Sequence, residues 1–340
     1  GERMAKRNGG TITLQKEIRI LSNAAAVGKK EGEGPLGSRF DFVTRNDRMG
    51  QKSWELAESE LQRTAIDLAL RKGSLRHCDL DLILAGDLLN QCIGSFLASM
   101  HSDVPYLGQY GACSTMAEGL ALAAAAVNAG YAERAAALTA SHFATAERQY
   151  RFPLGYGGQR TPTAQWTVTG SGCCIVGAEG SGPFINCATI GRIEDYGIKD
   201  ASNMGAAMAP AAFSTLKAHF KDTGLGPQDY DLIVTGDLGS LGSRILIDLF
   251  HRDGLSFGAN YRDCGVMIYD AARQDVHAGG SGCGCGASVL CGYLLRQLHA
   301  RKLGSLLFCA TGALMSPVST WQGESIPAIC HAVSICNERR

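Results

Sequence analysis

A cysteine at the start of a predicted helix is the residue best placed to do chemistry in this chain. It lies in the sequence GACST, residues 111–115, between a short predicted strand and an alanine-rich helical stretch. The free N–H groups and the dipole at a helix N-terminus stabilise a thiolate, and they also hold an oxyanion or a bound carboxylate. Cys113 is therefore a candidate nucleophile or part of an anion site, and the alternative is a buried cysteine in a turn.

Two aspartates follow segments that repeat within the chain. Residues 79–88 read DLDLILAGDL and residues 229–238 read DYDLIVTGDL, which are identical at seven of ten positions. The two copies lie 150 residues apart, which is too far for a solenoid. The repeat therefore predicts two similar halves in one chain. Asp87 and Asp237 then follow equivalent buried strands, and ligands of α/β proteins favour such strand ends. The alternative is that each aspartate forms a turn by bonding the backbone.

The hydrophobic pattern predicts the order βαβαβαββ in each half, with mainly parallel sheets covered by helices. We expect the halves to be residues 1–182 and 183–340. The predicted strands are 18–27, 81–85, 106–112, 134–141 and 167–178 in the first half, and 184–193, 231–235, 276–280, 305–311 and 326–335 in the second. The predicted helices are 52–72, 90–100 and 114–129, then 209–221, 244–251 and 286–300.

Composition excludes several classes of function. The 32 Lys and Arg balance the 32 Asp and Glu, so no basic stripe for nucleic acid is expected. No secretory signal is seen, and no apolar run reaches the roughly 18 residues that span a bilayer. The 13 cysteines form no CxxC pair, so no metal is expected. The glycine-rich residues 278–287 lack the full GxGxxG spacing, and no cofactor is expected.

Two βαβαβαββ halves with GACST before the long helix resemble the thiolase and ketoacyl-synthase superfamily. The resemblance implies a layered α/β/α/β/α fold in which Cys113 is an acyl-accepting nucleophile. Its partners in the superfamily are a His, and a His or Asn, in two turns of the second half. Here Asp237 and Cys283 occupy those turns. An ionised carboxylate raises a thiol pKa, so the departure argues against acyl transfer.

A narrower resemblance covers residues 34–317. The stretches that carry it are GPLGSRFD, LAGDLLNQ, GACST, ATAERQYRFPLGYGGQ, TVTGSG, MGAAMAPAA, HFKD, DYDLIVTGDL, DCGVMIY, AGGSGCGC and ATGALMSP. They resemble the stage V sporulation protein AD family. This implies a non-catalytic subunit that binds dipicolinic acid (pyridine-2,6-dicarboxylic acid) and moves it during sporulation and germination. It further implies a peripheral place at the spore inner membrane, held by membrane-embedded subunits. An acyltransferase using Cys113 is the alternative.

The predicted ligand site combines both patterns. It consists of Cys113, Ser114, Thr115, Asp87, Asn90, Asp237, Ser240, Gly282 and Cys283, with no catalytic residue assigned. The aspartates fit a dianion better if one is protonated or if Ca²⁺ accompanies the ligand. We expect bulky residues at Ser114 or Gly282 to block the ligand without unfolding the protein. Residues 147–165 are predicted to be a long loop that caps the pocket, forms a dimer contact or is solvated. A homodimer through the strand at 106–112 follows the superfamily habit.

Overall fold

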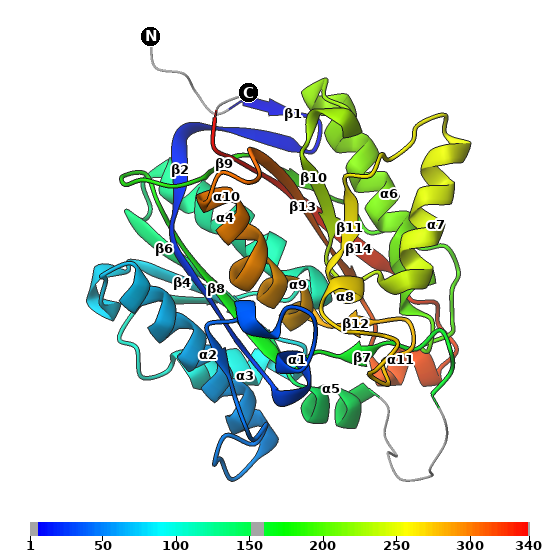
Figure 1. Cartoon of the computed structure of the whole chain (residues 1–340), viewed down its shortest axis with the longest axis horizontal. Helices are drawn as coiled ribbons and strands as arrows, with labels where there is room; N and C mark the ends of the chain where they lie inside the picture. The colour runs from blue at the N-terminus through cyan, green and yellow to red at the C-terminus, as the bar shows by residue number, and fades with distance from the viewer. Residues whose placement is uncertain (1–5, 151–159, 339–340) are drawn as a thin grey trace.

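The computed structural model describes residues 6–150 and 160–338. Within them, a mixed sheet has the strand order β11-β10-β13-β14-β9-β2-β8-β6-β4-β5 (Figure 1). The first half supplies β2 (Thr11–Val27), β4 (Leu82–Gly86), β5 (Tyr106–Gly108), β6 (Arg134–Ser141) and β8 (Gly170–Gly177). The second half supplies β9 (Phe184–Ile190), β10 (Leu232–Thr235), β11 (Tyr261–Asp263), β13 (Ser305–Ala313) and β14 (Ala328–Cys336). Two short strands, β1 (Lys6–Asn8) and β3 (Phe42–Val43), pair with β2.

The strand order shows the duplication directly. Counted along the chain, each half arranges its five strands as third, second, fourth, fifth, first. The fifth strand of each half, β8 or β14, is antiparallel to its neighbours, while the others pair in parallel. The two first strands, β2 and β9, pair antiparallel and join the halves. The repeated segments predicted from the sequence contain β4 and β10, which hold equivalent positions in the two halves.

Three layers of helices and the two halves of the sheet form five layers, α/β/α/β/α, as the resemblance from sequence implied. The middle layer holds α4 (Thr115–Ala129) and a helix that runs from α9 (Cys283–Val289) through a π turn into α10 (Leu295–His299). The first outer layer is α2 (Trp54–Lys72) with α3 (Ile93–Ser99), and the second is α6 (Met204–Thr223) with α7 (Gly239–Arg252) (Figure 1). Three buried apolar clusters fill the spaces between the layers.

Side chains that point alternately to the two faces of the sheet fill these clusters. In β8, Ile175 packs towards α2 while Val176 packs towards the middle layer. In β13, Leu307 faces the outer helices and Phe308 faces the middle layer. Successive side chains of a strand point to opposite faces, and both faces of the sheet are covered over its central strands, so strands such as β8 and β13 are buried along their whole length. This explains the continuous apolar runs in the sequence.

Helix α4 is apolar because it lies between the two halves of the sheet, in contact with β6 on one side and with β13 and β14 on the other. Residues 112–129 are long and apolar enough, by composition, to cross a membrane, and 61% of that stretch is buried in the protein. Its many alanines allow both sheets to approach closely, and a helix that is hydrophobic all round is typical of a core. Its composition is therefore explained by its place in the middle layer.

Two sequence predictions about elements are wrong. The third strand of the second half is not 276–280 but β11, a three-residue strand beside β10. Gly280–Ser281 instead form β12, which pairs with β7 (Trp166–Thr167) apart from the main sheet. Residues 143–150, partly assigned to the long loop, form helix α5 (Phe143–Tyr150). The strand Tyr-Arg-Asp is too short and polar for a pattern of apolar residues to reveal it.

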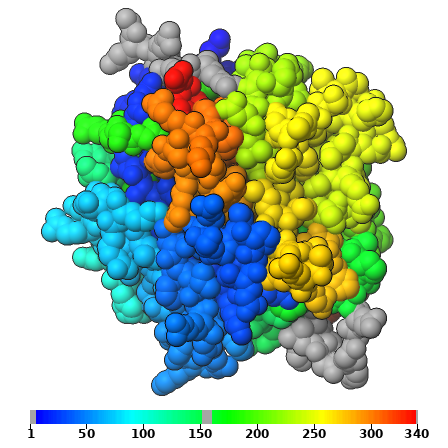
Figure 2. Space-filling model, in the orientation of Figure 1, coloured from blue at the N-terminus to red at the C-terminus, as the bar shows by residue number. Residues whose placement is uncertain are grey.

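A segment of the first half ties the two halves together. It contains α1 (Lys29–Gly32) and lies at the surface between them, in blue near the centre of the lower face in Figure 2. The buried Glu31 carboxylate accepts bonds from the Tyr269 hydroxyl and the Thr169 N–H. Burial raises the pKa of Glu31 to about 7. Gln274 also donates to the Lys30 carbonyl at 2.7 Å, so these contacts fix one half against the other.

Candidate functional site

The turn before α4 presents Cys113 at the junction of the two halves. It is a 3-10 turn, Ala112–Ser114, and Ala112 has a φ of 50°. Non-glycine residues with positive φ are strained and cluster at functional sites. The Ser114 hydroxyl donates to the Gly111 carbonyl and the Thr115 hydroxyl to the Ala112 carbonyl, both at 2.6 Å. These two hydroxyls therefore hold the turn, and Cys113 is the member of the trio that lines a pocket.

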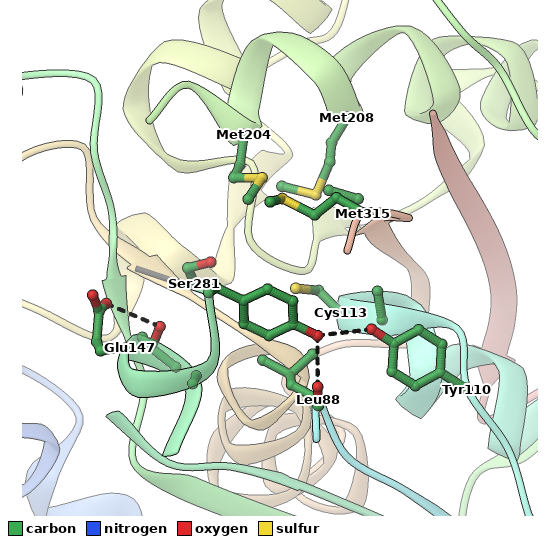
Figure 3. A pocket seen from close by; sticks show the side chains of 13 residues that line it. Leu88, Tyr110, Cys113, Glu147, Met204, Met208, Ser281 and Met315 are labelled. Carbon is green, nitrogen blue, oxygen red and sulfur yellow. Dashed lines mark hydrogen bonds between the residues drawn. The ribbon is translucent and has the colours of Figure 1, made fainter. Parts of the chain in front are cut away.

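The pocket encloses about 550 Å³ of space, its open mouth included. Both halves line it, with Met204, Met208 and Met315 on one side and Leu88 and Tyr110 on the other (Figure 3). The remaining lining residues are Ala112, Cys113, Ala146, Glu147, Tyr150, Thr167, Ser281 and Ala313.

Asp237 lies directly behind the pocket wall. It follows β10, it is fully buried, and its carboxylate accepts bonds from the Gly282 N–H at 2.8 Å and the Thr311 hydroxyl at 3.2 Å. The Ser281 hydroxyl lies 3.5 Å from the same carboxylate. Burial raises the pKa of Asp237 to about 7, although hydrogen bonds from Cys113 and Gly282 oppose that shift. The group therefore changes charge near neutral pH.

The same geometry keeps the Cys113 thiol protonated. Burial raises its pKa well above the usual value of a thiol, and the negative charge of Asp237 raises it further. A nearby cation or base lowers the pKa of a nucleophilic cysteine, whereas a carboxylate does the opposite. Asp237 thus stands beside Cys113, as the resemblance from sequence implied. The helix N-terminus does not outweigh the effects of burial and of Asp237 on the thiol pKa.

The other predicted residues spread around this centre. The buried Asp87 carboxylate accepts bonds from the Leu89 N–H and from the N–H and hydroxyl of Ser95, so it organises the loop after β4 behind Leu88. The exposed Asn90 donates its N–H to Gln149.

On the second half, Ser240 is exposed at the start of α7, and its N–H bonds the Ala278 carbonyl. Cys283 is buried at the start of α9, the position equivalent to Cys113, and its thiol bonds the Ala140 carbonyl at 2.9 Å. Asp87, Asn90, Ser240 and Cys283 therefore lie outside the pocket lining, and their ligand roles stay predictions.

The structure corrects one expectation about substitutions. Ser114 is fully buried, and Gly282 has a φ of 98° that side chains rarely adopt. A Cβ at Gly282 would come within 2.7 Å of the Ser141 hydroxyl oxygen. Bulky residues at Ser114 or Gly282 would therefore disturb the fold rather than fill the pocket selectively.

Sequence reasoning missed the three methionines and Tyr110 of the pocket. Met204 and Met208 lie in the stretch MGAAMAPAA and Met315 in ATGALMSP, and both stretches carry the family resemblance. The four-residue spacing in α6 was the available signal, since it places two side chains on one helix face. Tyr150 falls in the predicted loop, of which Arg151, Phe152 and Tyr156 lie outside the described residues.

The fold defines the class of protein. The chain superposes on 3-oxoacyl-[acyl-carrier-protein] synthase III of Aquifex aeolicus VF5 with a TM-score of 0.60 at 13% identity, covering 94% of this chain and 99% of that one. It also superposes on cerulenin-bound OleA of Xanthomonas campestris with a TM-score of 0.61 at 14% identity, covering 98% of both chains. At such identities these likenesses show a thiolase-like fold.

The family follows from sequence. The model of stage V sporulation protein AD matches residues 8–336. "Stage V sporulation protein AD" of Bacillus subtilis (strain 168) is 47% identical over 323 residues, or 95% of each chain. The chain belongs to the stage V sporulation protein AD family and so to the proteins of sporulation, as the resemblance from sequence implied.

Proposed function

We propose that this chain is a non-catalytic subunit that binds dipicolinic acid, alone or as its Ca²⁺ chelate. It would act in the uptake of this acid into the developing spore and in its release during germination. The observation that carries the proposal is the pocket at the Cys113 turn, where the Asp237 carboxyl interacts with the thiol and raises its pKa. Membership of the sporulation family supports the same conclusion. The chain would work peripherally at the spore inner membrane, with membrane-embedded subunits as partners and no role for nucleic acid.

Asp237 gives the pocket two ways to receive a dicarboxylate. Because it lies behind the wall, it acts through its charge: when protonated it is neutral and tolerates a dianion, and when ionised it repels one. A Ca²⁺ chelate removes that repulsion, because the cation neutralises the ligand and prefers oxygen ligands. The buried Glu147 is a second carboxyl group at the pocket wall, and it accepts from the Thr167 hydroxyl at 3.5 Å.

Calorimetric titration of the purified chain with dipicolinic acid tests the proposal, with and without Ca²⁺. We expect saturable binding, and we expect pyridine-3,5-dicarboxylic acid to bind far more weakly, because its carboxylates cannot share one cation with the ring nitrogen. Equal heats from both isomers, or none from either, would contradict the proposed function.

Binding of the free acid should depend on pH through Asp237. The pKa of this carboxyl is raised to about 7, so the neutral form dominates below that pH and the charged form above it. We expect affinity for dipicolinate without Ca²⁺ to fall as pH rises through this value, by up to about tenfold per pH unit. Titrations from about pH 6 to about pH 8 measure the fall. The Asp237→Asn variant, neutral throughout, should lose it, and a retained dependence would assign the effect to another group.

Acyl transfer by Cys113 is the alternative function, favoured by the fold of the two solved enzymes and by the place of Cys113 in the pocket. We expect acyl-CoA to leave no stable label on Cys113, and iodoacetamide to modify it more slowly than the exposed Cys78. Asp237→Asn should speed the modification by about tenfold, because it removes a charge that raises the thiol pKa. Peptide mass spectrometry measures both, and a stable acyl group lost in Cys113→Ser would establish the enzyme.

We also propose a homodimer through the edge strand β5. Leu107 is 55% exposed on that edge, and Leu122 of α4 and Tyr131, which follows α4, are exposed beside it. An unpaired strand edge beside exposed apolar side chains is a template for pairing with a second copy. Sedimentation at micromolar concentration should show a dimer, and Leu107→Lys should give monomers. A wild-type profile of monomers alone would reject this arrangement.

A further inference from the structure

We infer that Met204, Met208 and Met315 form the wall that recognises the flat aromatic ring of the ligand. The inference rests on the proposed function and deepens it, since it assigns the selectivity of the pocket for an aromatic dicarboxylate to three thioether side chains. Figure 3 shows the three side chains together on one side of the pocket, with Cys113 between them and Tyr110.

The methionine wall is built from two elements of the second half. Met204 and Met208 lie one turn apart on the same face of α6. The side-chain oxygen of Asn203 caps that helix by accepting from the Ala206 N–H. Met315 approaches from the segment after β13, so its position depends on the sheet rather than on α6.

The start of α6 is also fixed by close packing. Gly205 lies so near to α7 that an added Cβ would come within 2.7 Å of the Leu238 carbonyl oxygen. Met208 is fully buried while Met204 and Met315 are partly exposed, so the wall runs from the interior to the pocket mouth. The backbone of this wall and the packed Met208 are therefore held in place, while the partly exposed side chains of Met204 and Met315 can still adjust.

The opposite wall is held by a chain of hydrogen bonds. The Tyr150 hydroxyl lies 2.6 Å from the Leu88 carbonyl oxygen, to which it donates, and 2.9 Å from the Tyr110 hydroxyl. Burial raises the pKa of Tyr110 to about 12, so its hydroxyl stays protonated. Tyrosine side chains fixed in this way face adaptable methionines across the cavity, which suits a thin, rigid ligand.

The chemistry of the wall favours a ring over a carboxylate. Thioethers are polarizable and make favourable contacts with aromatic rings, worth about 0.3–1.5 kcal/mol each. They carry no charge and donate no hydrogen bond, so they contribute little to carboxylate recognition. The polar groups are placed elsewhere, at Ser281, Thr167 and Glu147. The pocket thus separates recognition of the ring from recognition of the carboxylates.

The test compares the wild-type chain with the triple variant Met204→Leu, Met208→Leu and Met315→Leu, in the presence of Ca²⁺. Leucine preserves apolar volume but removes the thioether. The probes are dipicolinic acid, its saturated analogue piperidine-2,6-dicarboxylic acid, and ringless oxydiacetic acid. We expect the variant to bind dipicolinic acid about tenfold more weakly and the two non-aromatic probes within about twofold of wild type. Met100→Leu, at an exposed methionine outside the pocket, is the matched control and should bind all three unchanged.

The outcomes separate the inference from the proposed function. If the wild-type chain binds none of the probes, the proposed function fails and the inference fails with it. If the wild type binds dipicolinic acid but the triple variant binds it equally well, the methionines do not contact the ring, although the function stands. If the variant loses all three probes in equal proportion, with a native unfolding curve, the methionines provide general packing only, and ring recognition is overturned.

Discussion

We expect Ser281→Phe to reduce the affinity for dipicolinic acid by more than about 100-fold, a loss of about 2.7 kcal/mol of binding free energy. Ser281 is partly exposed on β12, and its side chain lines the pocket (Figure 3). Its hydroxyl lies 3.5 Å from the Asp237 carboxylate. A phenyl ring at this position would occupy the space between the two halves that the ligand needs. Because the side chain enters a cavity rather than a packed core, the free energy of unfolding should change by only about 1 kcal/mol or less.

The matched control is Ser240→Phe. Ser240 was predicted from sequence to bind the ligand, but it is exposed on α7 outside the pocket lining. The same change of residue type there should leave affinity within about twofold. Calorimetric titration and a thermal unfolding curve measure both variants. Normal binding by Ser281→Phe together with weak binding by Ser240→Phe would move the site to the start of α7.

Much of the fold could be predicted because duplication leaves a signal that survives in sequence. The segments 79–88 and 229–238 become equivalent strands, and their spacing gave the order of elements in both halves. The prediction went wrong where local pattern was weak. Strand β11 has three residues and takes its place from pairing with β10, a contact between residues distant along the chain. No period in the sequence reports such a contact.

The candidate site was predictable only in part, for a related reason. The superfamily resemblance implied that Asp237 and Cys113 occupy one site, and in the structure the two side chains interact. Asp87 holds the equivalent position after β4, yet it bonds Ser95 and organises a loop. Asp87 and Asp237 thus hold equivalent positions but make different contacts, because the loops that follow β4 and β10 differ. The methionine wall could not be recognised from the sequence for another reason: apolar residues in helices usually belong to the core.

The second large effect is expected from a single methyl group at Gly312. This residue lies near the end of β13, which is paired on both sides, by β10 and β14. A Cβ there would come within 2.2 Å of the Gly111 carbonyl oxygen and 3.2 Å of the Cys113 backbone nitrogen. The Gly111 carbonyl already accepts from both the N–H and the hydroxyl of Ser114, so it cannot turn aside without breaking the turn before α4.

Gly312→Ala should therefore cost about 3 kcal/mol of unfolding free energy, near the upper end of overpacking effects, and weaken ligand binding by at least about tenfold. Chemical denaturation followed by calorimetry measures both. Gly258→Ala is the control, because Gly258 is exposed and its nearest neighbour within reach is a side-chain oxygen of Asn260 at 3.3 Å. If Gly312→Ala were as stable and bound as tightly as this control, the turn before α4 would be free to move, and its contact with β13 could not be what holds Cys113 at the pocket. If stability fell while affinity stayed intact, that contact would serve the fold alone.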